Sequence, residues 1–272
     1  MNTIKRFGAW SLVALLMLGG LTAIGAAAEA PTLQRIIQNG TLRVGMSGDQ
    51  APLNAKDRSG EMMGLEVDLA ELLAGAFEVE LEIVQKPFPE LLPALKAGEV
   101  DVVISGLSIT PARTAEVSFV GPYVLSGKSI LTKSRLLAAA QDASDIDEAN
   151  IKLVALSGST SESFVKRYIP EAQLTTTSDY DAGLQMVLKD EADAMVADMP
   201  ACLLSVLRYP QEELATLSQP MTIEPIGIAL PANDPQFKNL LENYLGAIEG
   251  TGILELLRQK WFEDPSWVAA LP

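Results

Sequence analysis

The chain has 272 residues, a formal net charge of −15 and no histidine. This acidity disfavours nucleic acid and anionic membrane surfaces as partners, and 48% hydrophobic residues are too many for a disordered protein. The absence of histidine excludes Ser-His-Asp triads, Cys-His pairs and histidine metal sites. The single cysteine, Cys202, cannot form an internal disulfide, and we interpret it as a buried packing residue.

Residues 1–28 have the pattern of a cleavable signal peptide. Lys5 and Arg6 precede an apolar run over residues 10–24, and three alanines at 26–28 supply the small residues that cleavage needs. Because Cys202 is far from this segment, we predict no lipid anchor. Removing the segment changes the net charge from −15 to −17, since it contains two cations and no acid. The sequence therefore predicts an exported, periplasmic protein, which we expect to be a monomer.

The chain after this segment alternates between helix and strand. We expect helices over 33–38, 65–77 and 88–97, and strands over 41–46, 79–84 and 102–104. This alternation is typical of an α/β fold with a mostly parallel sheet, in which loops at the carboxyl ends of strands bind ligands. The loops 47–53 and 105–113 are expected at such ends.

A second alternating series follows a break at residues 121–127. A strand over 128–132 leads away from the break, and a helix and a loop are expected over 136–150. The second series itself begins at Lys152, with expected strands over 152–156, 173–176 and 192–197 and expected helices over 160–168, 179–189 and 200–207. A strand over 221–230 and two helices, 234–249 and 251–261, end the chain. The apolar faces of these last helices must be covered, so we expect the chain to cross back to the first series.

The sequence thus predicts two lobes. One lobe would contain residues 29–125 and 223–272, and the other would contain 126–222. Two crossing strands, near 126–131 and 222–227, would form a hinge between the lobes.

The segment 101–113 has features of an anion site. Thr110 and Pro111 form an N-cap and first-turn pair that begins a helix, and Arg113 lies in its first turn. The helix dipole disfavours a cation at that end, so the arginine needs another reason to be there. The residues alone leave two interpretations open: an anion cradle, or an arginine that binds a surface carboxylate.

Ordered motifs along the chain resemble the periplasmic substrate-binding proteins for polar amino acids, the receptors of ABC importers. The motifs lie at 42–45, 64–70, 101–113, 119–123, 158–160, 192–198 and 260–262. The resemblance implies a two-lobed fold of the type II periplasmic-binding class, in which each lobe is a sheet flanked by helices. It also implies a small amino-acid or carboxylate ligand, no cofactor or metal, and transient docking onto a membrane permease.

The same resemblance implies roles for residues of both lobes. Arg113, with Ser108 and backbone groups near Gly106, would bind the ligand carboxylate through its planar pair of donors. Ser159 and Thr160 would open a helix in the other lobe whose free N–H groups suit the same carboxylate.

Two positions have competing interpretations. The resemblance implies that Asp198 binds the α-ammonium of the ligand, although the residue also fits a helix N-cap ahead of Pro200. Phe88 would place its ring against the ligand side chain, or it is a core aromatic at the start of a helix.

The loop 47–53 departs from the family pattern. Gln50 and Ser47 stand where members carry an aromatic residue and an aspartate, and Leu53 replaces a phenylalanine. Losing a ring and an acid argues against a cationic ligand side chain. We therefore expect a neutral or acidic amino acid, or a related small carboxylate, with Gln50 offering its amide.

An enzyme on the same scaffold is the main alternative. The cyclohexadienyl dehydratases resemble this family, and a lysine of that group matches Lys128. Their catalytic glutamate corresponds to Ala201, and a methyl group cannot act as a general acid. We therefore expect no catalysis, with a cyclohexadienyl or arogenate dehydratase-like enzyme as the alternative and a ligand-sensing receptor for a signalling partner as a second one.

Four acids at the start of the second expected helix form a cluster. They are Glu61, Glu66, Asp68 and Glu71. Their spacing does not follow a calcium loop, so we expect a solvated helix face and not a cation site.

Overall fold

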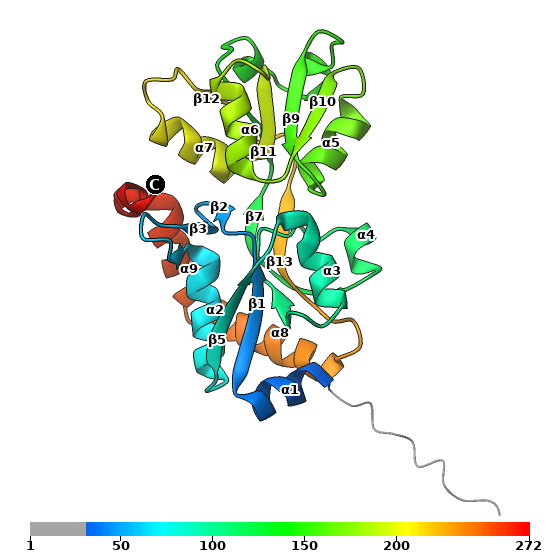
Figure 1. The fold of residues 1–272 in the computed structure, drawn as a ribbon, viewed down its shortest axis with the longest axis vertical. Helices are drawn as coiled ribbons and strands as arrows, with labels where there is room; N and C mark the ends of the chain where they lie inside the picture. The colour runs from blue at the N-terminus through cyan, green and yellow to red at the C-terminus, as the bar shows by residue number, and fades with distance from the viewer. Residues whose placement is uncertain (1–30) are drawn as a thin grey trace, which may run out of the picture.

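The computed structural model describes residues 31–272, so the predicted signal peptide lies outside the described residues. Figure 1 shows two lobes arranged along the long axis of the molecule and joined by strands that pass between them. Each lobe has a five-stranded sheet with helices packed against it, which confirms the predicted two-lobed α/β fold. Between residues 31 and 272, no helix is both long and apolar enough to cross a membrane.

The lower lobe in Figure 1 is built on a sheet with the order β5-β1-β6-β13-β7. Its strands are β1 (Thr41–Met46), β5 (Glu80–Gln85), β6 (Val102–Val103), β7 (Ser118–Ser126) and β13 (Glu224–Leu230). β1 runs parallel to β5 and β6, whereas β13 runs antiparallel to β6 and β7. The parallel part therefore carries the predicted binding loops, and the antiparallel part contains the strands that lead to the other lobe.

Helices cover both faces of this sheet. They are α1 (Pro31–Asn39), α2 (Leu65–Ala76), α3 (Leu91–Lys96), α8 (Pro235–Gly250) and α9 (Ile253–Arg258). Leu69 of α2 and Phe237 of α8 are fully buried in one core with Val44 of β1. The apolar faces of the last two helices are thus covered by the first lobe, as their sequence pattern requires.

The upper lobe has a sheet with the order β10-β9-β11-β8-β12. Its strands are β8 (Lys128–Thr132), β9 (Lys152–Leu156), β10 (Gln173–Thr177), β11 (Ala194–Asp198) and β12 (Ala215–Thr216), and its helices are α5 (Thr160–Tyr168), α6 (Tyr180–Leu188) and α7 (Met199–Arg208). β9 pairs in parallel with β10 and β11, and β8 is antiparallel to β11. Asp179 caps α6 by accepting a hydrogen bond from Ala182 N.

Two crossings connect the lobes. β7 passes into β8 through Gly127, and the segment before β13 returns beside it. Lys128 N donates to Thr222 Oγ1 at 2.9 Å, and Met221 N donates to Lys128 O at 2.7 Å. A Cβ at Gly127 would lie 2.0 Å from the Thr222 carbonyl oxygen, so only glycine allows this close approach. We propose that these crossings are the hinge and that the lobes divide near residues 125 and 223.

Several expected loops and helices differ from the structure. Residues 49–50, expected in a loop, form β2 (Asp49–Gln50), which joins β3 (Asn54–Lys56) and β4 (Met62–Met63) in a small antiparallel sheet. Pro122, expected to break the pattern, lies inside β7, where the sheet edge tolerates a missing N–H. The expected helix within 136–150 is two short 3-10 turns, Leu137–Ala139 and Ala143–Ile146.

Glu66 contradicts the expected solvated helix face. It is fully buried and accepts hydrogen bonds from Gly106 N at 2.6 Å, from Asn54 Nδ2 at 2.5 Å and from the Tyr123 hydroxyl. Burial raises the pKa of Glu66, and these hydrogen bonds oppose the rise. The expectation fails because the first turn of α2 points into the lobe, although Glu61 and Glu71 are exposed.

Candidate ligand-binding site

Arg113 lies at the boundary between the two lobes. It belongs to α4 (Pro111–Thr114), a single turn whose N-cap Thr110 accepts a hydrogen bond from Arg113 N through its hydroxyl, as predicted. Nη1 donates to Ser108 O at 3.0 Å in the lower lobe, and Nη2 donates to Gly158 O at 3.2 Å in the upper lobe. The guanidinium is therefore bonded to both lobes at once.

The Arg113 guanidinium retains unused donors. Two of its five N–H groups bind carbonyl oxygens, and no carboxylate within residues 31–272 forms a salt bridge with it. Burial lowers the pKa of Arg113, while the charges of Glu224 and Asp198 oppose this shift. Of the two interpretations of the sequence, the surface carboxylate partner is wrong, and an anion cradle remains.

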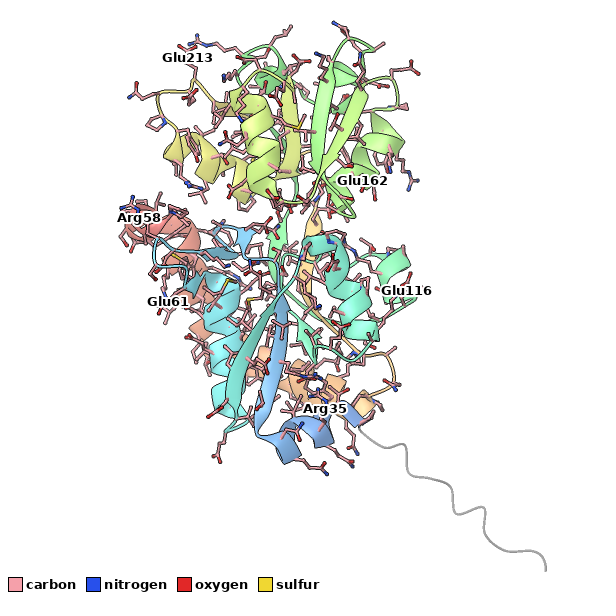
Figure 2. The ribbon with its side chains drawn as sticks, in the orientation of Figure 1. Arg35, Arg58, Glu61, Glu116, Glu162 and Glu213 are labelled. Carbon is pink, nitrogen blue, oxygen red and sulfur yellow. The ribbon has the colours of Figure 1, made fainter. Side chains whose placement is uncertain are left out.

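Ser108 and Thr160 approach each other across the boundary. Their hydroxyl oxygens are 3.2 Å apart, and Ser108 is buried. Ser159 instead serves the upper lobe itself, because its hydroxyl accepts from Glu162 N and donates to Leu156 O at 2.6 Å. Figure 2 shows Glu162 at the edge of the upper lobe that faces the lower one, where its carboxylate accepts from Gly158 N.

The predicted contribution of Gly106 is wrong for its N–H group. That N–H donates to the buried carboxylate of Glu66, so it is not free for a ligand. The glycine has a positive φ of 61°, and a Cβ there would lie 2.2 Å from the Gln50 amide oxygen. Gly106 therefore allows the Gln50 side chain to lie directly over the backbone of the segment that leads to Arg113.

Asp198 forms a buried ion pair with Lys128. The Nζ–Oδ1 distance is 2.8 Å, and the side chains are 1% and 8% exposed for Lys128 and Asp198. The two residues face each other in the pairing of β8 with β11, so the sheet register itself brings them together. Asp198 is the N-cap residue of α7, as one interpretation predicts, but its side chain makes no cap hydrogen bond and binds Lys128 instead.

Glu224 is a second acid at the same place, and the sequence analysis missed it. Its Oε2 lies 3.7 Å from Lys128 Nζ, and its Oε1 accepts from Thr222 Oγ1 at 3.3 Å. Glu224 opens β13 at the hinge crossing. No local pattern marks this position, because only the return of the chain from the upper lobe places it beside Lys128.

Phe88 and Gln50 extend the site on the lower lobe. Phe88 is buried in a core cluster, as one interpretation predicts, and the Arg113 guanidinium lies 5.8 Å from its ring centroid. Its contact with a ligand side chain stays a prediction. Gln50 Nε2 donates to the Tyr180 hydroxyl at 3.2 Å, and Tyr180 N donates to Asp49 Oδ2 at 3.0 Å. Tyr180 is another upper-lobe residue of the site that the sequence analysis missed.

Residues 31–272 offer neither a metal-binding cluster nor a reactive thiol. Within residues 31–272, no group of three or more histidines, cysteines or acids is arranged to hold a metal ion. Cys202 is buried, and this burial raises the pKa of its thiol to about 12. The thiol is therefore protonated and inert at neutral pH, as expected for a packing residue.

The comparison with protein families identifies the family of the chain. The model for bacterial extracellular solute-binding proteins, family 3, matches residues 42–264. The chain belongs to this family. Solved structures that resemble it are two-lobed amino-acid-binding proteins, in agreement with the architecture of this chain.

Individual relatives include both binding proteins and an enzyme. Cyclohexadienyl dehydratase of Pseudomonas aeruginosa is 27% identical over 250 residues, covering 92% of this chain and 93% of its own. The ancestral amino acid-binding protein AncCDT-1, described as a precursor of cyclohexadienyl dehydratase, is 34% identical, with a TM-score of 0.78 over 85% of this chain and 99% of its own. A binding component of an ABC transporter from Wolinella succinogenes, complexed with lysine, is 33% identical, with a TM-score of 0.80 and the same coverage.

Proposed function

We propose that this protein binds a small amino acid, or a closely related carboxylate, between its lobes in the periplasm and delivers it to an ABC importer. The observation that carries the proposal is the Arg113 guanidinium, which lies half-buried between the lobes, donates a hydrogen bond to a carbonyl of each, and has three N–H donors without a partner in the described chain. A guanidinium of this kind matches the two oxygens of a carboxylate.

The charges around the site favour a neutral or acidic ligand over a cationic one. Arg113 and Lys128 supply two positive charges, which Asp198 and Glu224 balance. A zwitterionic ligand adds no net charge to these four side chains, whereas a ligand with a cationic side chain adds a positive charge that has no partner. The unused donors of the two cations suit a further carboxylate better than a further ammonium.

Lobe closure provides the capture mechanism. Ser108 and Thr160 already meet at 3.2 Å, and Arg113 reaches Gly158 O in the opposite lobe. A ligand held by Arg113 adds contacts to both lobes in this closed arrangement, so its binding shifts the equilibrium from open to closed. The closed form would then dock onto the permease.

Substitution of Arg113 tests the proposal. We expect Arg113→Ala to weaken amino-acid binding at least about 100-fold, or about 3 kcal/mol, because a buried charge-assisted pair is lost. Isothermal titration measures the affinity, and thermal unfolding checks that the variant folds. Arg58→Ala is the matched control, because Arg58 also donates to a backbone carbonyl, that of Leu271, but lies on the opposite side of the molecule from α4 (Figures 1 and 2). Retained affinity in Arg113→Ala would contradict the proposal.

A dehydratase is the second candidate function. It is favoured by the similarity to the P. aeruginosa enzyme and by the buried position of Lys128 in the site. Against it, Ala201 in the first turn of α7 carries no proton to transfer. We expect no product when the protein is incubated with prephenate or arogenate, and chromatographic detection of an Arg113-dependent product would make the protein an enzyme.

The proposed output is import and not signalling. Uptake of the bound amino acid into vesicles that contain the cognate permease and ATPase tests this output directly. We expect uptake to require the binding protein. Ligand-dependent association with a receptor, without uptake, would support the signalling alternative.

A further inference from the structure

Gln50 and Tyr180 form a hydrogen-bonded pair across the lobe boundary. Gln50 lies on β2 of the lower lobe and Tyr180 begins α6 of the upper lobe, and the Nε2–hydroxyl distance is 3.2 Å. Their exposed fractions are 2% and 7%. Because each residue comes from a different lobe, the pair exists only when the lobes are closed.

One atom of the Gln50 amide has no partner. The Oε1 atom is buried and accepts no hydrogen bond from any residue of the described chain. Buried polar atoms are nearly always hydrogen-bonded, so an orphaned one at a lobe boundary points to a bound molecule. The amide lies against Gly106, which is part of the same segment as Ser108 and Arg113.

The Tyr180 hydroxyl lies near the charged groups of the site. Burial raises the pKa of Tyr180 well above its ordinary value of 10.0, and the carboxylate of Asp198 adds to this rise while the Arg113 charge opposes it. The Gln50 amide, which binds this hydroxyl, lies against Gly106 of the segment that leads to Ser108 and Arg113. The pair is therefore in the same interlobe region as the arginine that would hold the ligand carboxylate.

An amide and a hydroxyl that share one hydrogen bond always leave at least one free donor and at least one free acceptor. In the orientation of the structure, the Tyr180 O–H and the second N–H of Gln50 are free donors, and the Gln50 Oε1 is the free acceptor. If the amide is turned by 180°, the Gln50 NH₂ becomes the donor and the Tyr180 oxygen becomes the acceptor. The chemistry offered to a ligand is the same in both cases.

We propose that Gln50 and Tyr180 select a ligand whose side chain ends in a group that both donates and accepts, namely a primary carboxamide or a hydroxyl. The inference rests on the proposed function, since it assumes an amino acid held by Arg113. A carboxylate leaves the free acceptor without a donor, an ammonium leaves the free donor without an acceptor, and a hydrocarbon leaves both unpaired. A site with unpaired buried polar groups rejects such ligands by about 10- to 100-fold or more.

Matched amino acids of equal size test this selection. The sets are glutamine, glutamate and methionine; asparagine, aspartate and leucine; and threonine with valine. In at least one set, we expect isothermal titration to show the carboxamide or hydroxyl ligand binding about tenfold or more tightly than its partners. Equal affinities within every set, with binding that still depends on Arg113, would overturn the inference and leave the proposed function intact.

Variants of Gln50 and Tyr180 test whether these two residues cause the ligand preference. Tyr180→Phe removes a single oxygen and should reduce the preference at least about tenfold, while the affinity for the apolar member of the set (methionine, leucine or valine) changes little. Gln50→Met should have the same effect, and the double variant should lose no more than either single one, because the two groups act together. Tyr168→Phe is the matched control, since Tyr168 is 51% exposed on α5.

The outcomes separate the inference from the proposed function. Circular dichroism and thermal unfolding confirm that each variant folds. If Tyr180→Phe folds and keeps the full preference, the pair does not select the ligand. If the wild-type protein binds no member of any set in an Arg113-dependent manner, the proposed function fails, and this inference fails with it.

Discussion

Glu66 of the lower lobe and Asp198 of the upper lobe are both buried acids, but they have different partners. Glu66 receives three hydrogen bonds from neutral donors of its own lobe. Asp198 binds the ammonium of Lys128 through Oδ1, and its Oδ2 has no hydrogen-bond partner within the described chain. The first carboxylate is fully engaged, whereas the second retains an oxygen beside the lobe boundary.

This difference separates an acid that stabilises the fold from one that is available to a ligand. The bonds of Glu66 join α2 to the segment after β6 and to Tyr123 in β7, so they hold one lobe together. Asp198 already has its charge balanced by Lys128, and its free oxygen can accept a ligand ammonium without leaving a bare charge. The implied role of Asp198 in binding remains a proposal, now with Lys128 and Glu224 as its neighbours.

Removing Glu66 should produce the largest loss of stability. Glu66→Ala leaves the donors of Asn54, Gly106 and Tyr123 buried without an acceptor, so we expect the free energy of unfolding to fall by about 4 kcal/mol. Urea unfolding measures it. Glu71→Ala, at an exposed position of the same helix, should change it by less than about 0.5 kcal/mol. Equal losses of stability in the two variants would show that buried Glu66 stabilises the fold no more than an exposed acid does.

Removing the charge of Asp198 should affect binding and stability together, but less strongly. Asp198→Asn keeps an acceptor for Lys128, and Glu224 remains 3.7 Å from Nζ, so we expect a stability loss of about 1–2 kcal/mol. The affinity for a zwitterionic amino acid should fall about tenfold or more, because its ammonium loses a charged partner. Thermal unfolding and isothermal titration measure the two effects. Unchanged affinity would place Asp198 with Glu66 as a purely structural acid.

The hydroxyl pair at the boundary should contribute less again. Ser108→Ala removes the contact with Thr160, so we expect affinity to weaken by about 1 kcal/mol, a few-fold, with little change in stability. Thr160→Val should have the same effect, and combining the substitutions should add nothing. Additive losses, measured by titration of all three variants, would show that the two hydroxyls act separately.

The smallest expected effect is a pH dependence of ligand affinity that comes from Asp49. Burial raises the pKa of Asp49 above its ordinary value of 3.8, and its Oδ2 accepts from Tyr180 N in the opposite lobe. An acid with a raised pKa in the closed form binds protons more readily there, so closure weakens as pH rises from 3.8 through the raised pKa. We expect ligand affinity to be slightly higher at pH 5 than at pH 7, and Asp49→Asn to flatten this dependence. An unchanged pH profile in the variant would exclude Asp49 as its source.

The sequence predicted what depends on neighbouring residues. The bounds of β1 match the expected strand 41–46, and Thr110 caps the turn that positions Arg113. Strand alternation and helix capping act within a few residues, so they can be recognised in a single sequence. The same local rules identified the two α/β series. The apolar faces of α8 and α9, which had to be covered, indicated that the chain returns to the first lobe.

Tertiary structure alone decided which side chains meet. Gln50 and Tyr180 are 130 positions apart, and Lys128 and Asp198 are 70 apart. The first pair depends on the closure of the lobes and the second on the register of β8 with β11, neither of which leaves a local pattern in the sequence. By itself, therefore, the sequence determined the family, the two-lobed fold and the capped turn that carries Arg113. Folding determined the partners of its acids, because burial and pairing are properties of distant segments brought into contact.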